Sequence, residues 1–288
     1  MRKLKFKKYN DVDEFKVGVL DILLEDEVVN NLPISVLIDS KRDNAADWLL
    51  STVVDEQGTI VLIAVCTKPF NLLLYEPGGL HNDPALEFLA SELKRIKFAP
   101  PGVLAKSELA QRFTNVYCGG SGSSLHMSMV LMRLDELADY SKAPGFSRIL
   151  IEDDLLYTPK WERAFCIDCN IHVYTLSENE ERIRTRLGKD AHFIWEDGEP
   201  VAQAVIGRNT PNSAVISWVY TPPPFRGRGY ATSVVAEVSK SAFDKGKRFC
   251  CLFADAANPV SCGVYSKLGY YKVCLFDEIR FDTVDSVT

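Results

Sequence analysis

The chain has 288 residues, of which 47% are hydrophobic and 25% are charged, and its formal net charge is −6. This length allows one large domain or two ordinary ones, and the composition is typical of a soluble globular protein. The acidic balance argues against a protein whose main partner is nucleic acid or an anionic membrane. No apolar run follows the basic stretch of residues 1–8, so we expect no secretory signal, no membrane span and a cytoplasmic location.

Eight cysteines in a chain of this length do not indicate a disulfide-stapled domain. Cys166 and Cys169 form a Cys-x-x-Cys pair, but no second pair stands at the spacing of a zinc site. We interpret them as reduced thiols in a helix, and Cys250 and Cys251 as neighbours on opposite faces of a strand. We therefore expect no metal ion.

The first half of the chain mixes short strands and helices. Residues 3–7 alternate lysine with apolar residues, which predicts an edge strand with a solvated basic face. The Gly-Ser tract 119–124 predicts a flexible turn, and the Pro-Gly tract near residues 139–146 predicts a domain boundary. The remaining expected elements are strands at 59–65, 71–75 and 127–134 and helices at 84–96 and 106–113.

The second half is more regular. Thr158 is expected to cap a helix that ends near Cys169, and Ser177 with Glu180 resembles a capping box. Asp197-Gly198 is a strong hairpin signal. The apolar strand 249–254 after a strand and a helix implies a parallel pair, hence a mixed α/β fold. The other expected strands are 192–195, 201–206, 214–220, 270–276 and 279–281, and the other helices are 229–245 and a short one capped by Asn258.

A glycine-rich turn, Arg226-Gly227-Arg228-Gly229-Tyr230-Ala231, joins the strand 214–220 to the helix 229–245. Glycines let a ligand approach the backbone, and the start of a helix presents unpaired N–H groups and a positive dipole end. A pyrophosphate is the ligand that such a turn is expected to bind, although a tight turn with a purely structural role would have the same glycines. The stretch is neither a Walker A loop nor a complete dinucleotide fingerprint.

This turn resembles the Arg/Gln-x-x-Gly-x-Gly/Ala signature of the GNAT N-acetyltransferase superfamily. Residues 219–225 before it resemble the family's splayed strand and approach loop, and residues 258–270 resemble its second motif. The resemblance covers roughly residues 150–283. It implies the acyl-CoA N-acyltransferase fold, a mixed and mostly antiparallel twisted sheet flanked by helices. We expect this fold in two halves, a degenerate GNAT-like domain at 1–145 and a catalytic domain at 146–288.

The resemblance implies that acetyl-CoA is the co-substrate and that the N–H groups of residues 226–231 hold its pyrophosphate. The backbones of Val219 and Thr221 would pair with the pantetheine arm, and one amide there would polarise the thioester. The implied cofactor-binding residues are Val219, Tyr220, Thr221, Arg226, Gly227, Arg228, Gly229, Tyr230, Ala231, Thr232, Asn258, Ser261 and Tyr265.

Tyr265 is the implied catalytic residue, as proton donor to the departing thiolate. A phenol titrates at about 10 and a thiol at about 8.5, so the transfer would cost little, and a short hydrogen bond would also serve. On the short helix, Val260, Val264 and Leu268 are expected to form the core stripe, which turns Ser261 and Tyr265 toward the cofactor.

The general base is less well marked. Glu196, Asp197 and Asp255 are the acidic candidates near strand ends, although Asp197 also fits a simple turn residue and Asp255 could order a loop. None of the histidines lies in a motif, and each is interpreted as a surface or packing residue: His81, His126, His172 and His192.

The leading hypothesis is transfer of an acetyl group to a primary amine of a small molecule, amino acid or peptide, by direct attack. One alternative is a glycine N-acyltransferase-like enzyme that uses bulkier acyl-CoAs. Another is a non-catalytic CoA-binding or interaction protein. We expect a monomer or homodimer, and neither nucleic acid nor a membrane as partner.

Overall fold

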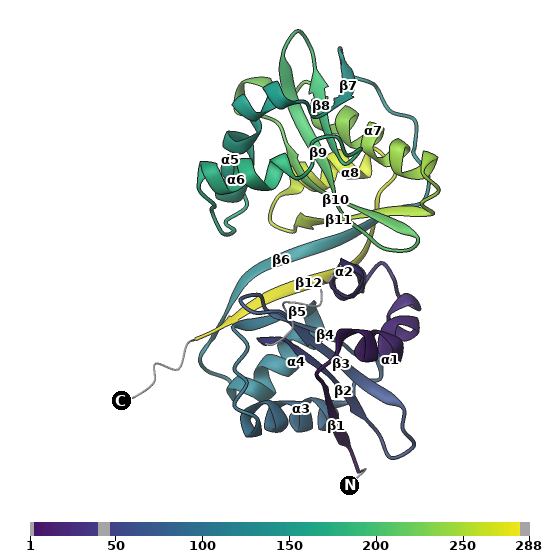
Figure 1. Ribbon diagram of the computed structural model, residues 1–288, viewed down its shortest axis with the longest axis vertical. Helices are drawn as coiled ribbons and strands as arrows, with labels where there is room; N and C mark the ends of the chain where they lie inside the picture. Colours follow the sequence, from purple (N-terminus) through teal and green to yellow (C-terminus); the bar gives the residue numbers. More distant parts are fainter. Residues whose placement is uncertain (1–2, 40–46, 283–288) are drawn as a thin grey trace. The chain divides into compact units, whose positions relative to one another are not determined.

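A computed structural model describes residues 3–39 and 47–282, so the first two residues of the basic N-terminal stretch lie outside the described residues. The chain forms two compact units (Figure 1). Unit 1 contains residues 1–130 and 274–288, and unit 2 contains residues 131–273. This division differs from the boundary expected at residue 145, because residues 131–145 belong to unit 2 and residues 274–282 belong to unit 1. No helix in the described ranges is long and apolar enough to cross a membrane.

Unit 1 is built on a sheet with the strand order β1-β2-β3-β4-β5-β12. Its first four strands pair antiparallel, whereas β4 and β5 pair parallel. As expected, the N-terminal strand lies at the sheet edge. The elements are β1 (Lys5–Tyr9), α1 (Val12–Leu24), α2 (Asn31–Asp39), β2 (Leu49–Val54), β3 (Ile60–Cys66), β4 (Leu72–Tyr75), η2 (Pro77–Gly79), α3 (Asp83–Arg95), β5 (Gly102–Lys106) and α4 (Ser107–Cys118).

Both faces of the unit 1 sheet are covered. Strand β3 is apolar on both sides, and alternate residues point to opposite faces. Leu62 and Ala64 belong to a core that includes Leu89 of α3 and Phe113 of α4. On the other face, Ile63 lies beside residues of α1 and α2. The near-continuous apolar runs of these strands follow from burial on both faces.

Unit 2 repeats this plan with the strand order β11-β10-β9-β8-β7. Strands β7 to β10 pair antiparallel, and β10 and β11 pair parallel on either side of α7 in sequence. The elements are β7 (Phe146–Ile149), η3 (Glu152–Leu156), α5 (Thr158–Asp168), α6 (Leu176–Arg184), β8 (His192–Glu196), β9 (Pro200–Asn209), β10 (Ser213–Tyr220), η4 (Pro223–Phe225), α7 (Tyr230–Asp244), β11 (Phe249–Asp255) and α8 (Pro259–Ser266). The expected class, a mixed and mostly antiparallel sheet flanked by helices, is confirmed.

Two strands contribute residues to both units: β6 (Ser123–Leu134) and β12 (Tyr271–Phe281). The sequence predicted two closing strands, at 270–276 and 279–281, and this prediction is wrong because β12 is continuous. The two charged residues between them, Asp277 and Glu278, do not break it. Asp277 is buried and accepts hydrogen bonds from Ser107 and Ser128, which satisfies its carboxylate within a strand.

Two helix caps differ from the prediction. Tyr157, not Thr158, precedes α5, and the Thr158 hydroxyl donates to the Asp154 carbonyl at 2.9 Å. The capping box of α6 lies two residues earlier than expected, with Thr175 accepting from the Glu178 N–H. In both places several residues of the capping type stand close together, so the pattern alone does not choose between them.

Candidate active site

The parallel strands β10 and β11 separate after a short contact. Their register runs from Ser213 opposite Phe249 to Val215 opposite Cys251, and no further pairs form between the described residues of these strands. On its other side β10 pairs with β9, with Ser217 opposite Val205 and Tyr220 opposite Gln203. Two residues of β10 therefore lie opposite one residue of β9, which is a β-bulge. This arrangement leaves the C-terminal half of β10 available to an extended ligand on the β11 side.

A series of buried hydrogen bonds between side chains and the backbone stabilises the bulge in β10. Trp218 has a positive φ of 54°, which is rare for a residue other than glycine. Its carbonyl accepts from the Gln203 side-chain amide at 3.3 Å, and the Gln203 Oε1 lies 3.3 Å from Nε2 of His192. Gln203 and His192 are both fully buried. The bulge is therefore supported from inside the sheet, and no pattern in the sequence marked these two residues for that role.

Helix α7 begins with an uncapped end. Its N-cap is Gly229, with φ 82°, and no side chain caps the helix. The first hydrogen bond into this end runs from Ser233 N to Gly229 O at 3.0 Å. The N–H groups of residues 230–232 therefore have no partner among the described residues, and the first turn contains no acidic side chain. Such an end attracts an anion.

Arg226 closes the loop that leads to this helix. Its N–H donates to the Pro223 carbonyl, its Nε donates to the Thr221 carbonyl at 2.9 Å, and its Nη2 pairs with Asp168 at 2.8 Å. The N–H of Arg226 is thus used by the loop itself and does not point to a ligand as the resemblance implied. Of the N–H groups expected to face an anion, that of Arg226 is therefore already used, whereas those of residues 230–232 have no partner among the described residues.

Tyr230 anchors the start of α7 to the hairpin that joins β8 and β9. The ring is buried, and the phenol donates to Asp197 Oδ2 at 2.5 Å. This hydrogen bond is the main cause of the raised pKa of Tyr230. Arg228, in contrast, is exposed. Asp197 is therefore a turn residue with a structural partner, as one of its two interpretations had it, and is not a free base.

The residues that end β10 divide between core and ligand side. Tyr220 is buried in a cluster with Trp161, at 6.5 Å between ring centroids, so its side chain packs rather than binds. Alternation places Val219 and Thr221 on the opposite side. Val219 is half-buried, and the Thr221 hydroxyl is buried without a hydrogen-bond partner in the described part of the chain. A buried hydroxyl without a partner is costly, so the Thr221 hydroxyl has hydrogen-bonding capacity left for a ligand.

Helix α8 carries the expected tyrosine in an unexpected environment. Asn258 caps the helix by accepting from the Ser261 N–H at 3.1 Å, so one of its polar groups is already used. Tyr265 is buried and packs edge to face against Tyr270 at 5.9 Å. Val260, expected in the core, is 75% exposed. The predicted stripe is wrong at this position, because the helix buries Tyr265 instead.

Burial raises the pKa of Tyr265 to about 12, although a hydrogen bond from Ser261 partly offsets this. Full transfer of its proton to a thiolate with a pKa near ~8.5 would cost on the order of 5 kcal/mol. Tyr265 is therefore a neutral phenol suited to donating a hydrogen bond to a sulfur anion. Of the two expected actions of Tyr265, the raised pKa makes complete proton transfer costly and leaves the short hydrogen bond.

The acidic candidates for the base all have partners. Glu196 accepts from Arg148 Nε at 2.5 Å, and Asp255 accepts from the Ala257 N–H at 2.8 Å within the turn after β11. Asp255 thus orders a loop, as one of its interpretations had it.

The histidine and the cysteines of this region are neutral. His192 is buried, and burial lowers its pKa to about 3. Cys166 and Cys169 are free thiols, and burial raises the pKa of Cys169 to about 11.

An aromatic and cationic cluster beside the bulge was not anticipated from the sequence. The Arg182 guanidinium lies over the rings of Tyr174 and Trp218, at 4.2 and 5.1 Å, and Phe165 packs against Trp218. The Nη1 atom of Arg182 is buried without a hydrogen-bond partner among the residues described. Phe165 lies in α5, Arg182 in α6 and Trp218 in β10, and Tyr174 lies between α5 and α6, so only the folded chain brings them together.

Residues 157–270 match the model of the acetyltransferase (GNAT) family. These residues form a GNAT domain. The match contains the bulged strand, the loop, the uncapped helix α7 and Tyr265. GNAT proteins generally use acetyl-CoA, and membership supports an acyl-CoA-dependent N-acyltransferase. Among curated proteins, no sequence matches the chain.

Solved structures of GNAT proteins share the fold over both units. A GCN5-related N-acetyltransferase from Sphaerobacter thermophilus has a TM-score of 0.66 at 17% identity, covering 96% of this chain and 95% of that one. A GNAT-family acetyltransferase from Colwellia psychrerythraea gives 0.58 at 12% identity, with coverages of 96% and 98%. A tandem GNAT protein of the clavulanic acid pathway gives 0.57 at 13%, with coverages of 96% and 97%. At these identities the likeness concerns the fold alone.

Proposed function

We propose that the chain transfers an acetyl group from acetyl-CoA to a primary amine of a small molecule, an amino acid or a peptide. The observation that carries the proposal is the uncapped start of α7 directly after the bulged strand β10. The chain would act in the cytoplasm, as a monomer or homodimer. Its free cysteines fit a reducing compartment.

The groups available in unit 2 fit the two ends of acetyl-CoA. The unpaired N–H groups of residues 230–232 would hold the pyrophosphate, with Gly227 and Gly229 giving close access to the backbone. The backbones of Val219 and Thr221 would pair with the pantetheine arm, and the Thr221 hydroxyl would gain the partner that it lacks. Acetyl-CoA, when bound, supplies the activated thioester.

Tyr265 would act on the leaving group. Its phenol is neutral over the physiological pH range, since its pKa is raised to about 12. It would donate a hydrogen bond to the sulfur as negative charge develops there, and a complete proton transfer is not required. Asn258 and Ser261 would contribute mainly by fixing the helix that carries Tyr265, through the cap between them.

The amine must be neutral to attack. Because Glu196, Asp197 and Asp255 already have partners, no carboxylate among these three candidates is ready to take its proton. We therefore propose that water removes the proton or that the acceptor enters as its neutral fraction. The rate would then rise with pH toward the pKa of the free amine.

The anion site can be tested with a matched pair of variants at Ala231, which is half-buried in the first turn of α7. Ala231→Glu places a carboxylate where the pyrophosphate would lie, and Ala231→Gln places a neutral side chain of similar size there. A negative charge near a helix start stabilises the helix, so the glutamate variant should fold. Isothermal titration should show acetyl-CoA bound at least ~10-fold more weakly by the glutamate than by the glutamine variant.

Equal affinity of the two variants would remove the anion site from the proposal. Activity is measured separately, as release of free thiol with a panel of amino acids, polyamines and peptides. Binding of acetyl-CoA without thiol release for any acceptor would favour a non-catalytic CoA-binding protein. Faster release from longer acyl-CoAs would favour the alternative with bulkier acyl groups.

A further inference from the structure

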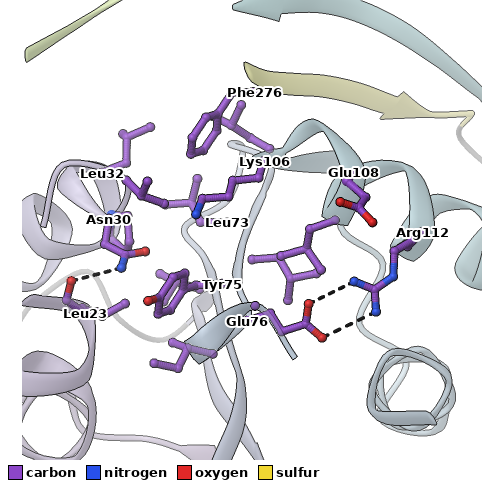
Figure 2. A pocket seen from close by; sticks show the side chains of 18 of the residues that line it. Leu23, Asn30, Leu32, Leu73, Tyr75, Glu76, Lys106, Glu108, Arg112 and Phe276 are labelled. Carbon is purple, nitrogen blue, oxygen red and sulfur yellow. Dashed lines mark hydrogen bonds and ion pairs between the residues drawn. The ribbon is translucent and has the colours of Figure 1, made fainter. Parts of the chain in front are cut away.

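Unit 1 contains a cavity that the proposed reaction does not use. Its volume is about 260 Å³, and it lies between the sheet strands β3, β4 and β5 and the α1–α2 segment (Figure 2). Phe276, from the part of β12 that belongs to unit 1, completes the lining. Most of its wall is apolar, and the main contributors are Leu23, Leu32, Ile63, Leu73, Leu104 and Phe276.

The cavity lies where unit 1 repeats the strand–helix–strand plan of unit 2. Strands β4 and β5 pair parallel only at Leu72 and Leu73, opposite Val103 and Leu104, as far as the described residues show. The helix between them, α3, starts differently from α7. Asn82 caps it by accepting from the Ala85 N–H, and Asp83 places a negative charge in its first turn. This end repels a phosphate.

The loop before α3 is also closed by charged side chains. Glu76, at the end of β4, accepts from the Asn82 N–H at 2.6 Å and from Arg112 Nη1 at 3.0 Å. Arg112 Nε pairs with Asp83 at 2.8 Å. Figure 2 shows the paired side chains of Glu76 and Arg112 at one end of the cavity. The acidic side chains of this loop repel the phosphates of a nucleotide, and Arg112, which could attract them, is already paired with Glu76 and Asp83. The cavity is therefore suited to a small ligand without phosphates.

One charged group faces the cavity with hydrogen-bonding capacity to spare. Lys106, at the end of β5, is half-exposed, and its Nζ lies 3.3 Å from Asp26. An ammonium has three N–H donors, and this contact uses one. The other charges have close partners: Glu76 pairs with Arg112, and Glu108 lies 3.0 Å from His81 at an exposed position. The chemistry of the cavity is thus an apolar chamber with one available ammonium.

We propose that unit 1 binds a small carboxylic acid with an apolar body, its carboxylate on Lys106 and its body among the leucines and Phe276. An apolar cavity of about 150 Å³ holds a six-carbon ring, so the volume in unit 1 suits about ten non-hydrogen atoms. Near the base of the cavity, the Asn30 Nδ2 donates to the Leu23 carbonyl at 3.0 Å. The Asn30 amide and the Tyr75 hydroxyl are uncharged, so the ligand's charge belongs at Lys106.

The test uses the full chain and octanoate as the probe, with 1-octanol as its uncharged match. Isothermal titration should show binding of octanoate to the wild type. Lys106→Met keeps the length and removes the charge, and should weaken octanoate at least tenfold while leaving 1-octanol within twofold. Lys106→Arg should keep octanoate binding. Leu32→Trp, at a half-buried lining position, should fill the cavity and abolish binding of both probes.

Each variant should bind acetyl-CoA as the wild type does, because its substitution lies in unit 1. A cooperative thermal unfolding transition is the control that each variant is folded. The inference is overturned if the wild type does not bind octanoate. It is equally overturned if Lys106→Met weakens both probes alike, or if Leu32→Trp leaves octanoate binding unchanged. Failure of the unit 2 proposal would not affect these outcomes, because they do not depend on CoA.

Discussion

At the scale of single residues, burial decides what the candidate groups can do. Tyr265 and His192 are both titratable and both withdrawn from water, and in each the pKa shifts toward the neutral form. A neutral phenol can still donate a hydrogen bond, whereas a neutral histidine with its Nε2 near Gln203 serves the framework. The same physical effect therefore leaves Tyr265 as a hydrogen-bond donor and His192 as part of the framework.

Tyr265→Phe should retain the packing against Tyr270 and lose the hydroxyl. We expect turnover to fall roughly 10- to 100-fold, because one positioned donor to the developing charge is removed. Acetyl-CoA affinity by titration should stay within about twofold of the wild type. Since the pKa of Tyr265 is raised to about 12, the wild-type rate should show no decline from its ionisation below pH ~11. A decline near pH 10 that disappears in Tyr265→Phe would contradict this environment.

His192 should make the protein sensitive to acid. Its pKa is lowered to about 3 by burial, and secondarily by the Arg186 charge, against ~6.5 in the unfolded chain. The folded pKa is depressed, so its stabilising contribution is complete above pH ~6.5 and is lost as pH falls toward 3. In His192→Asn the urea-derived free energy of unfolding should fall less steeply over this window, by at most about 1.4 kcal/mol per pH unit. Identical slopes would exclude this role.

At the scale of elements, the decisive contrast is between two helix starts. The periodicity of α7 and α3 predicts both helices with bounds correct to within a residue or two. The glycines before α7 also mark the turn at its start in the sequence, because few other residues adopt their positive φ. What the sequence did not show is that the Arg226 N–H is not among the free groups. It donates to the Pro223 carbonyl within the loop.

The bulge in β10 was equally out of reach of pattern reasoning. Its support comes from Gln203, a polar residue within the apolar run of β9. From its polarity alone, Gln203 would be expected on the solvent-exposed face of the sheet. Gln203→Leu would leave the Trp218 carbonyl without this donor. We expect a loss of about 1–3 kcal/mol in the free energy of unfolding and weaker acetyl-CoA binding. Gln203→Glu, which keeps the shape but removes the amide donor, should be at least as damaging; wild-type stability in both variants would show that the bulge needs no such support.

At the scale of the whole molecule, the chain has two units of one fold. Of the two helices that follow the parallel-paired strands β10 and β4, α7 has no side-chain cap, whereas α3 is capped by Asn82. Both units contain a parallel strand pair around a helix, a repetition that the resemblance anticipated. The unit boundaries were missed because β6 and β12 contribute to both units, and a sequence pattern does not show where a continuous strand changes partners. The cavity in unit 1 was missed because its lining comes from separate elements.

This asymmetry predicts the stoichiometry of CoA binding. The α7 start has free N–H groups and no acidic side chain in its first turn, whereas the α3 start is capped by Asn82 and carries Asp83. Titration of the wild-type chain should therefore give one acetyl-CoA per chain, and Ala231→Glu should weaken that single site without revealing a second. Free CoA should give the same count, because the phosphates rather than the acetyl group distinguish the units. Two sites per chain, or one that is unaffected by Ala231→Glu, would mean that unit 1 binds the nucleotide despite its closed loop.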